Sequence, residues 1–136
     1  MPSIVVIDTS VFVRALTGSK TSRALLDAAV DGLLKITTSE DLFNELVFTL
    51  KKPGLKKLIP ESEIGLTVAF VKKSAVFVNP SKPIKACRDD KDNPVLACAL
   101  EAKADVIAST DKDLLCMDSF ENIPILHPHF LLKLLG

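Results

Sequence analysis

The chain has 136 residues, of which 48% are apolar and 25% charged, and its 17 basic residues balance its 17 acidic ones. This length suits one globular domain, residues 1–136, with a sizeable core. No apolar run approaches the roughly 20 residues that span a bilayer, and no signal peptide is recognised at the N-terminus, so we expect a cytoplasmic protein without a membrane segment.

Short segments rich in β-branched residues alternate with longer helical patterns along the chain. In chain order we expect a strand at 3–8, helices at 11–16 and 21–34, a strand at 35–38, helices at 39–51 and 61–73, a strand at 75–78, a helix at 92–104, a strand at 105–109, a helix at 111–116, a strand at 123–126 and a helix at 130–135. Five strands separated by helices predict a three-layer α/β/α sandwich with a central, mainly parallel sheet. Sites in such sheets lie outside the carboxyl ends of the strands.

Two aspartates follow predicted strands directly. Asp8 ends the apolar run 4–7, and Asp111 follows the strand at 105–109 after Thr110. A rigid strand tip holds a carboxylate as a metal ligand requires. Asp8 could instead cap the following helix, but Ser10 can serve as that cap. We therefore expect Asp8 and Asp111 to be ligands.

The remaining candidates have competing interpretations. Glu45 lies on the flank of the apolar face of its helix, a position that also suits a solvated glutamate. Asp92 precedes Asn93-Pro94, so it is equally placed to begin a helix, and Asp89 and Asp90 are nearby alternatives. Asp113 would be an auxiliary ligand. The hydroxyl residues expected to orient the carboxylates or position water are Thr9, Ser10 and Thr110.

Four carboxylates gathered at strand tips repel one another unless a divalent cation lies between them. Oxygen ligands select hard cations, so Mg²⁺ or Mn²⁺ is the expected cofactor, and phosphodiester hydrolysis is the chemistry most often built on such a site. The sequence contains no GxxxxGK[ST] loop, no HExxH motif and no GxSxG elbow. These absences exclude the commonest alternatives to a carboxylate–metal site.

Cysteines and lysines leave two further questions open. Cys87, Cys98 and Cys116 form no Cys-x-x-Cys pair, which argues against a disulfide framework and against a zinc site shared with His127 and His129. The densest basic cluster, at 51–57, reads equally well as a solvated helix end and as a phosphate contact.

The segments that carry the four acids resemble the PIN domain, the nuclease fold of VapC-type toxins and of several RNA-processing factors. They are Ile-Val-Val-Ile-Asp8-Thr-Ser, Asn-Glu45-Leu-Val-Phe-Thr-Leu, Arg-Asp-Asp-Lys-Asp92-Asn-Pro-Val-Leu-Ala-Cys-Ala-Leu and Ala-Asp-Val-Ile-Ala-Ser-Thr-Asp111-Lys-Asp113-Leu-Leu. Their order and spacing are specific, although each motif alone is weak. Family members often have Thr-Gly-Asp where this chain has Ser109-Thr110-Asp111, a change that removes no ligand.

The resemblance implies a Mg²⁺- or Mn²⁺-dependent ribonuclease that uses Asp8, Glu45, Asp92 and Asp111 and acts on an RNA substrate. It further implies the toxin of a toxin–antitoxin pair, with an antitoxin protein as partner. The alternative is a non-catalytic PIN-like binding or scaffold module in RNA processing, which the presence of all four acids disfavours. A further set of apolar residues would supply a homodimer surface or else belong to the core: Leu66, Val68, Phe70, Val71 and residues 130–135.

Overall fold

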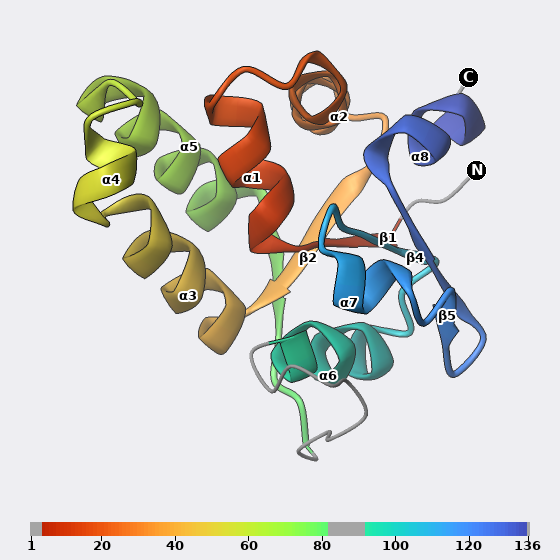
Figure 1. The fold of residues 1–136 in the computed structure, drawn as a ribbon. Helices are drawn as coiled ribbons and strands as arrows, with labels where there is room; N and C mark the ends of the chain where they lie inside the picture. Colours follow the sequence, from red (N-terminus) through yellow and green to blue (C-terminus); the bar gives the residue numbers. More distant parts are fainter. Residues whose placement is uncertain (1–3, 82–91, 136) are drawn as a thin grey trace.

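The structure is a computed structural model that describes residues 4–81 and 92–135. Asp89 and Asp90, the alternatives to Asp92, lie outside the described residues, as does Cys87. In the described part a mostly parallel sheet lies between two layers of helices (Figure 1), so the predicted α/β/α sandwich is confirmed.

The sheet has the strand order β3-β2-β1-β4-β6-β5, and only β5 runs antiparallel to its neighbour. The strands are β1 (Ile4–Ile7), β2 (Lys35–Ser39), β3 (Val76–Val78), β4 (Val106–Ala108), β5 (Ser119–Phe120) and β6 (Ile123–Leu126). From β1 the chain moves outward to β2 and β3, then returns to the other side of β1 with β4. The carboxyl ends of β1 and β4 therefore adjoin at the topological switch point, where open α/β sheets bind ligands.

The expected number of strands was wrong, since the described residues form six and not five. The additional strand, β5, pairs with β6 across a tight turn at Glu121 and Asn122, whose φ angles are 51° and 67°. Two successive positive φ values are those of a type I′ hairpin turn. A strand of two residues is too short to show an alternation of polar and apolar positions, so the sequence pattern does not reveal it.

The described residues form the helices α1 (Thr9–Leu16), α2 (Lys20–Val30), α3 (Glu40–Leu50), α4 (Pro53–Lys56), α5 (Glu61–Ser74), α6 (Asn93–Ala102), α7 (Lys112–Leu115) and α8 (Pro128–Leu135). Side chains of β1 alternate between the two helical layers, as the pleat of a strand requires. Val5 and Ile7 pack in one core cluster with residues of α1, α2, α5 and α8. Val6 packs in the other with residues of α6 and α7. Burial on both faces explains why this strand is apolar throughout.

The helix expected at 21–34 ends earlier, at Val30. Gly32, with φ of 81°, reverses the chain there. The N–H of Gly32 donates to the carbonyl of Ala29, and the N–H of Leu33 donates to that of Ala28. These two bonds are a Schellman motif, in which glycine adopts the left-handed conformation without the penalty of a Cβ.

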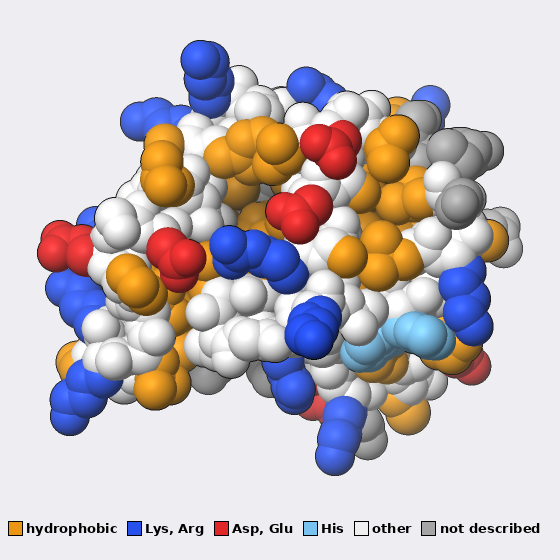
Figure 2. Space-filling view, turned by 90° about the horizontal axis from the view of Figure 1, so that it is seen from above, with side chains coloured by type: hydrophobic (Ala, Val, Ile, Leu, Met, Phe, Trp, Pro, Cys, Tyr) orange, Lys and Arg blue, Asp and Glu red, His pale blue; other side chains and the backbone are white. Residues whose placement is uncertain are grey.

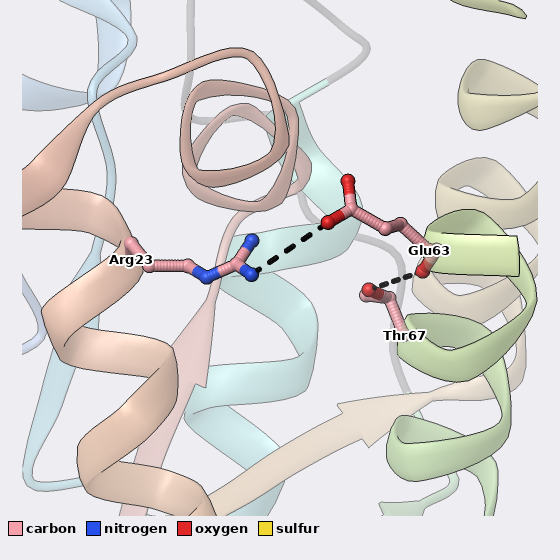
Figure 3. A network of polar contacts seen from close by, with 3 residues as sticks. All are labelled: Arg23, Glu63 and Thr67. Carbon is pink, nitrogen blue, oxygen red and sulfur yellow. Dashed lines mark hydrogen bonds and ion pairs between the residues drawn. The ribbon is translucent and has the colours of Figure 1, made fainter. Parts of the chain in front are cut away.

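Helices α2 and α5 face one another across an apolar groove. An ion pair crosses it, with 3.9 Å between Arg23 Nη2 and Glu63 Oε1 (Figure 3). Thr67 Oγ1 donates to the Glu63 carbonyl at 2.9 Å. Both charged side chains are about half exposed, so the pair contributes little to stability. Figure 2 shows the molecule from above, with apolar side chains interspersed among charged ones.

The residues suggested for a homodimer surface divide between core and surface. Val71 is only 2% exposed and belongs to the core, and Val68 and Phe70 pack partly against it, whereas Leu66 is 72% exposed. Helix α8 divides in the same way, with Leu131 and Leu135 buried and Phe130 and Leu134 exposed. Self-association through the exposed residues stays a prediction. None of the helices in the described ranges is long and apolar enough to cross a membrane.

Candidate metal centre

The two strand-tip aspartates lie side by side. The register pairs Ile7 of β1 with Ala108 of β4, and the Asp8 N–H donates to the Ala108 carbonyl at 2.9 Å. Asp8 therefore lies next to Ser109, and Asp111 follows two residues later at the start of α7. This adjacency follows directly from the return of the chain to β1, because parallel strands end at the same edge of a sheet.

Helix α6 brings a third carboxylate to the same place. Asp8, Asp92 and Asp111 each offer a carboxylate oxygen, and these oxygens all lie within 4.8 Å of one another. Among residues 4–81 and 92–135 this is the one group of three or more acidic, histidine or cysteine side chains that could hold a metal ion. Asp8 and Asp92 are only 5% and 6% exposed. Buried carboxylates at this spacing are unfavourable without a neutralising charge.

Helix capping does not account for these two buried aspartates. Asp8 occupies the N-cap position of α1, and Asp92 occupies that of α6. Neither side chain makes the cap hydrogen bond to the first turn of its helix. Asp111, in contrast, caps α7, since its Oδ1 accepts the N–H of Asp113 at 3.1 Å. The competing interpretation of Asp8 and Asp92 as ordinary caps is therefore not supported.

Two serines hold the Asp8 carboxylate. Ser10 Oγ and Ser109 Oγ both donate to Asp8 Oδ2, at 2.7 Å and 2.9 Å. The two hydroxyl oxygens in turn accept backbone N–H groups, of Thr110 at 3.1 Å and of Asp111 at 2.9 Å. Each serine thus connects Asp8 to the segment that carries Asp111. The orientation of the Asp8 carboxylate is fixed relative to the segment that carries Asp111 by this network.

The electrostatics of the site favour a bound cation. Burial raises the pKa of Asp8, the Ser10 and Ser109 hydroxyls oppose that rise, and the nearby charge of Asp111 adds to it. The ionised form of Asp8 is therefore costly in the metal-free protein. A divalent cation would remove that cost, because it offsets both the desolvation and the repulsion.

The carboxylates open into a cleft of about 510 Å³ between α1, α3, α6 and α7. Glu45 of α3 lines this cleft, as expected from the flank of its helix, but it does not belong to the group of three aspartates. Asp113 is neither in that group nor among the cleft-lining residues. The other residues that line the cleft are Thr9, Ser10, Val13, Arg14, Thr49, Thr110 and Lys112.

Several residues at the site were not foreseen from the sequence. Ser109 is fully buried and holds Asp8, and its position directly before Thr110 and Asp111 was an available signal. The positively charged side chains of Arg14 and Lys112 also line the cleft. No sequence pattern marks Arg14 as a site residue, because only the winding of α1 after Asp8 brings its side chain to the cleft.

The residues fit a hard divalent cation. The closest ligands are all carboxylate oxygens, the type that Mg²⁺ and Mn²⁺ prefer. An octahedral Mg²⁺ holds its ligands at about 2.1 Å, so that opposite ligands lie about 4.2 Å apart. Adjacent ligands of such an ion lie about 3.0 Å apart, so side-chain adjustments would bring the three oxygens, which lie within 4.8 Å of one another, around one ion.

The zinc site considered from the sequence is not formed by the described residues. Cys98 is buried and Cys116 is exposed, and both are free. His127 Nδ1 accepts the N–H of His129 at 3.1 Å, so this ring nitrogen is engaged at the start of α8. Burial lowers the pKa of His127, and the charges of His129 and Arg14 lower it further. The imidazole of His127 therefore favours its neutral form, which suits a structural role.

Comparison with known proteins agrees with this geometry. A family model described as the PIN domain matches residues 4–113. An uncharacterised protein of Methanocaldococcus jannaschii, MJ1680, is 32% identical over 115 residues, which cover 83% of this chain and 74% of that protein. The crystal structure of FitAcB from Neisseria gonorrhoeae is similar in fold, with a TM-score of 0.54 and 15% identity, covering 92% of this chain and 98% of the other. The chain belongs to the PIN domain family.

Proposed function

We propose that the protein is an endoribonuclease that depends on Mg²⁺ or Mn²⁺ and hydrolyses phosphodiester bonds of RNA. The observation that carries this proposal is the group of three aspartates, from three separate segments, whose oxygens lie within 4.8 Å at the switch point of the sheet. Family membership supports the reaction class, because PIN domains are generally metal-dependent nucleases.

The residues of the cleft would have different roles in the reaction. Asp8, Asp92 and Asp111 would hold the cation, while Ser10 and Ser109 keep Asp8 oriented. Glu45, on the wall of the cleft, completes the site directly or through water. When bound, the cation supplies charge neutralisation for the phosphate and lowers the pKa of the attacking water.

Two cationic side chains and several hydroxyls are placed to position the substrate. Arg14 of α1 and Lys112 of α7 line the same cleft as the acids. Their charges offset the repulsion between the phosphates of RNA and the acidic centre. The hydroxyls of Thr9, Thr49 and Thr110 also line the cleft and would contact phosphate or ribose oxygens.

Metal-dependent cleavage of single-stranded RNA tests the reaction. We expect wild-type protein to require Mg²⁺ or Mn²⁺, and Asp8→Asn to lower the rate at least about 100-fold, since a metal ligand is lost. Asp31→Asn, at an exposed position after α2, is the matched control and should cleave as the wild type does. Cleavage that survives EDTA, or equal rates for Asp8→Asn and wild type, would exclude this mechanism, and no cleavage by the wild type would favour the scaffold function.

In the cell we propose that the protein acts in the cytoplasm as the toxin of a toxin–antitoxin pair. The similarity to VapC-type toxins in all four acidic motifs supports this role and implies an antitoxin protein as partner. Induced expression should arrest growth for the wild type and not for Asp8→Asn at equal protein levels. Normal growth with an abundant, RNA-cleaving wild-type protein would contradict the toxin role alone.

A further inference from the structure

Phe48 of α3 is an aromatic side chain exposed to solvent. It is 70% exposed, although the chain has only 7 aromatic residues and neither tryptophan nor tyrosine. The helix buries Leu42, Leu46 and Leu50 on its opposite side, so Phe48 contributes nothing to that packing. Leaving a large apolar ring in water forgoes the stabilisation that its burial would bring. The ring is therefore available for contact with a partner outside the fold.

Phe48 is not itself a cleft-lining residue, but it lies one turn of α3 beyond Glu45, which is. Phe48 follows Glu45 by three positions on α3, and such pairs have Cβ atoms about 5–6 Å apart on one side of a helix. Thr49, the next residue, already lines the cleft. A nucleotide adjoining the one in the cleft would thus meet the face of α3 that carries Phe48.

One lysine contacts the same ring, and further lysines follow it along the chain. Lys52 Nζ lies 5.7 Å from the centroid of Phe48. Lys51, Lys56 and Lys57 lie on the exposed turn and at α4, so the basic cluster at 51–57 begins just after the aromatic side chain. In Figure 1 this region lies at the end of α3 that points away from α6 and α8. An aromatic face bordered by lysines is what proteins present to single-stranded nucleic acid.

A second ring provides an internal comparison. Phe130 of α8 is 56% exposed, and Lys133 Nζ also lies 5.7 Å from its centroid. The local pair is therefore the same, but no described residue of α8 lines the acidic cleft. The lysine–phenylalanine contact alone does not mark a site. What distinguishes Phe48 is its place beside Glu45 and before the lysine cluster.

We propose that Phe48 and Lys52 form a stacking platform on which an unpaired base of the RNA substrate lies, next to the nucleotide whose phosphate occupies the metal centre. The base stacks on the exposed ring, and Lys52 with its neighbours contacts the adjoining phosphates. Because every base has a π-face, the platform selects single-stranded RNA over duplex without selecting sequence. This inference rests on the proposed ribonuclease function.

The absence of tryptophan allows a direct test, because Phe48→Trp creates the single indole of the chain. In an Asp8→Asn background, which prevents cleavage, a short single-stranded RNA should quench the indole fluorescence of the Phe48→Trp variant. An abasic oligonucleotide of equal length keeps the phosphates and should quench it far less. Phe130→Trp is the matched control and should respond to neither.

Affinity measurements complete the test. Phe48→Ala should weaken binding of the RNA oligonucleotide about 5-fold to 100-fold, as the loss of one stacked base predicts, while Phe130→Ala leaves it unchanged. Equal affinities for the two alanine variants, or equal quenching by the abasic strand, would overturn the platform. A change in oligomeric mass for Phe48→Ala with unchanged RNA affinity would also overturn it, and would assign the ring to a protein contact.

The two proposals fail in different ways. Cleavage by the wild type, together with no response of the Phe48→Trp variant to RNA, rejects the platform and leaves the nuclease intact. Quenching by RNA without any cleavage by the wild type supports the platform and rejects the nuclease.

Discussion

Ser109 Oγ donates to Asp8 Oδ2 at 2.9 Å, across 101 positions of sequence and between the tips of two adjacent strands. The same Ser109 oxygen accepts the N–H of Asp111 at 2.9 Å. One fully buried hydroxyl therefore sets the relative position of two carboxylates that repel one another when both are ionised. The candidate metal centre is thus organised by this serine in the metal-free protein.

Replacing Ser109 with alanine should weaken the metal site without removing a ligand. The Asp8 carboxylate loses one donor, and the Asp111 N–H loses its acceptor. We expect affinity for Mg²⁺ to fall about 10-fold to 100-fold, as for other groups that orient metal ligands. A Mg²⁺ titration of the thermal midpoint measures this. Ser62→Ala, on the exposed side of α5, should retain wild-type affinity, and so equal values for both variants would refute the role of Ser109.

The pH dependence of the metal-free protein should reveal the cost of ionising Asp8. Burial raises the pKa of this carboxyl above its ordinary value of 3.8, and the charge of Asp111 adds to the effect. Between 3.8 and the raised value, the folded state keeps a proton that the unfolded chain has released, so the free energy of unfolding falls as pH rises through this window. Below the window the contribution is fully present.

Urea unfolding in EDTA over this pH range checks the sign. Asp8→Asn cannot ionise, so its unfolding midpoint should depend less on pH and should exceed that of the wild type at neutral pH. Added Mg²⁺ should then stabilise the wild type and not the variant. A metal-free Asp8→Asn protein that is less stable than the wild type at neutral pH would contradict the cost that we assign to Asp8.

The sequence predicts the positions of the strand-tip carboxylates well, because a carboxylate after an apolar strand has a defined place in a parallel sheet. Asp8 and Asp111 follow from that rule alone. Asp92 does not, since its approach to the site depends on how α6 packs against β1 and β2. Ser109 and Arg14 were missed for the same reason: their roles depend on register and on helix orientation, which residue pattern does not specify. Strand β5 has only 2 residues, which are too few to show an alternation of polar and apolar side chains.

From the sequence, Asp92 and Asp113 were both expected to contribute to the metal site, but the structure places them differently. Asp92 belongs to the group of three carboxylates, and Asp113 does not. We therefore expect Asp92→Asn to lower RNA cleavage at least about 100-fold, and Asp113→Asn to lower it far less. Cleavage rates at saturating Mg²⁺ distinguish them. An equal loss in both variants would mean that Asp113 moves into the site when the cation binds.

The terminal helix should contribute substantially to stability through one residue. Leu131 is fully buried between α8 and the rest of its core cluster, whereas Leu134, on the same helix, is 54% exposed. Leu131→Ala should lower the free energy of unfolding by about 2–5 kcal/mol, as expected for a large-to-small change in a packed core. Leu134→Ala should change it by less than about 0.5 kcal/mol. Urea denaturation of both variants measures the difference in the free energy of unfolding. Similar losses in the two variants would contradict the burial of Leu131 and the exposure of Leu134.

The two described cysteines should differ sharply in reactivity. Burial raises the pKa of the Cys98 thiol to about 12, against a weaker opposing hydrogen bond with Ser39, while Cys116 is exposed. Since the thiolate is the reactive form, iodoacetamide at about pH 8 should modify Cys116 and leave Cys98 intact in the folded protein. Peptide mapping by mass spectrometry identifies the modified residue, and labelling in urea, where Cys98 becomes accessible, is the control. Rapid modification of Cys98 without denaturant would show that the α6 side of the core opens readily, because the thiol could ionise only when exposed.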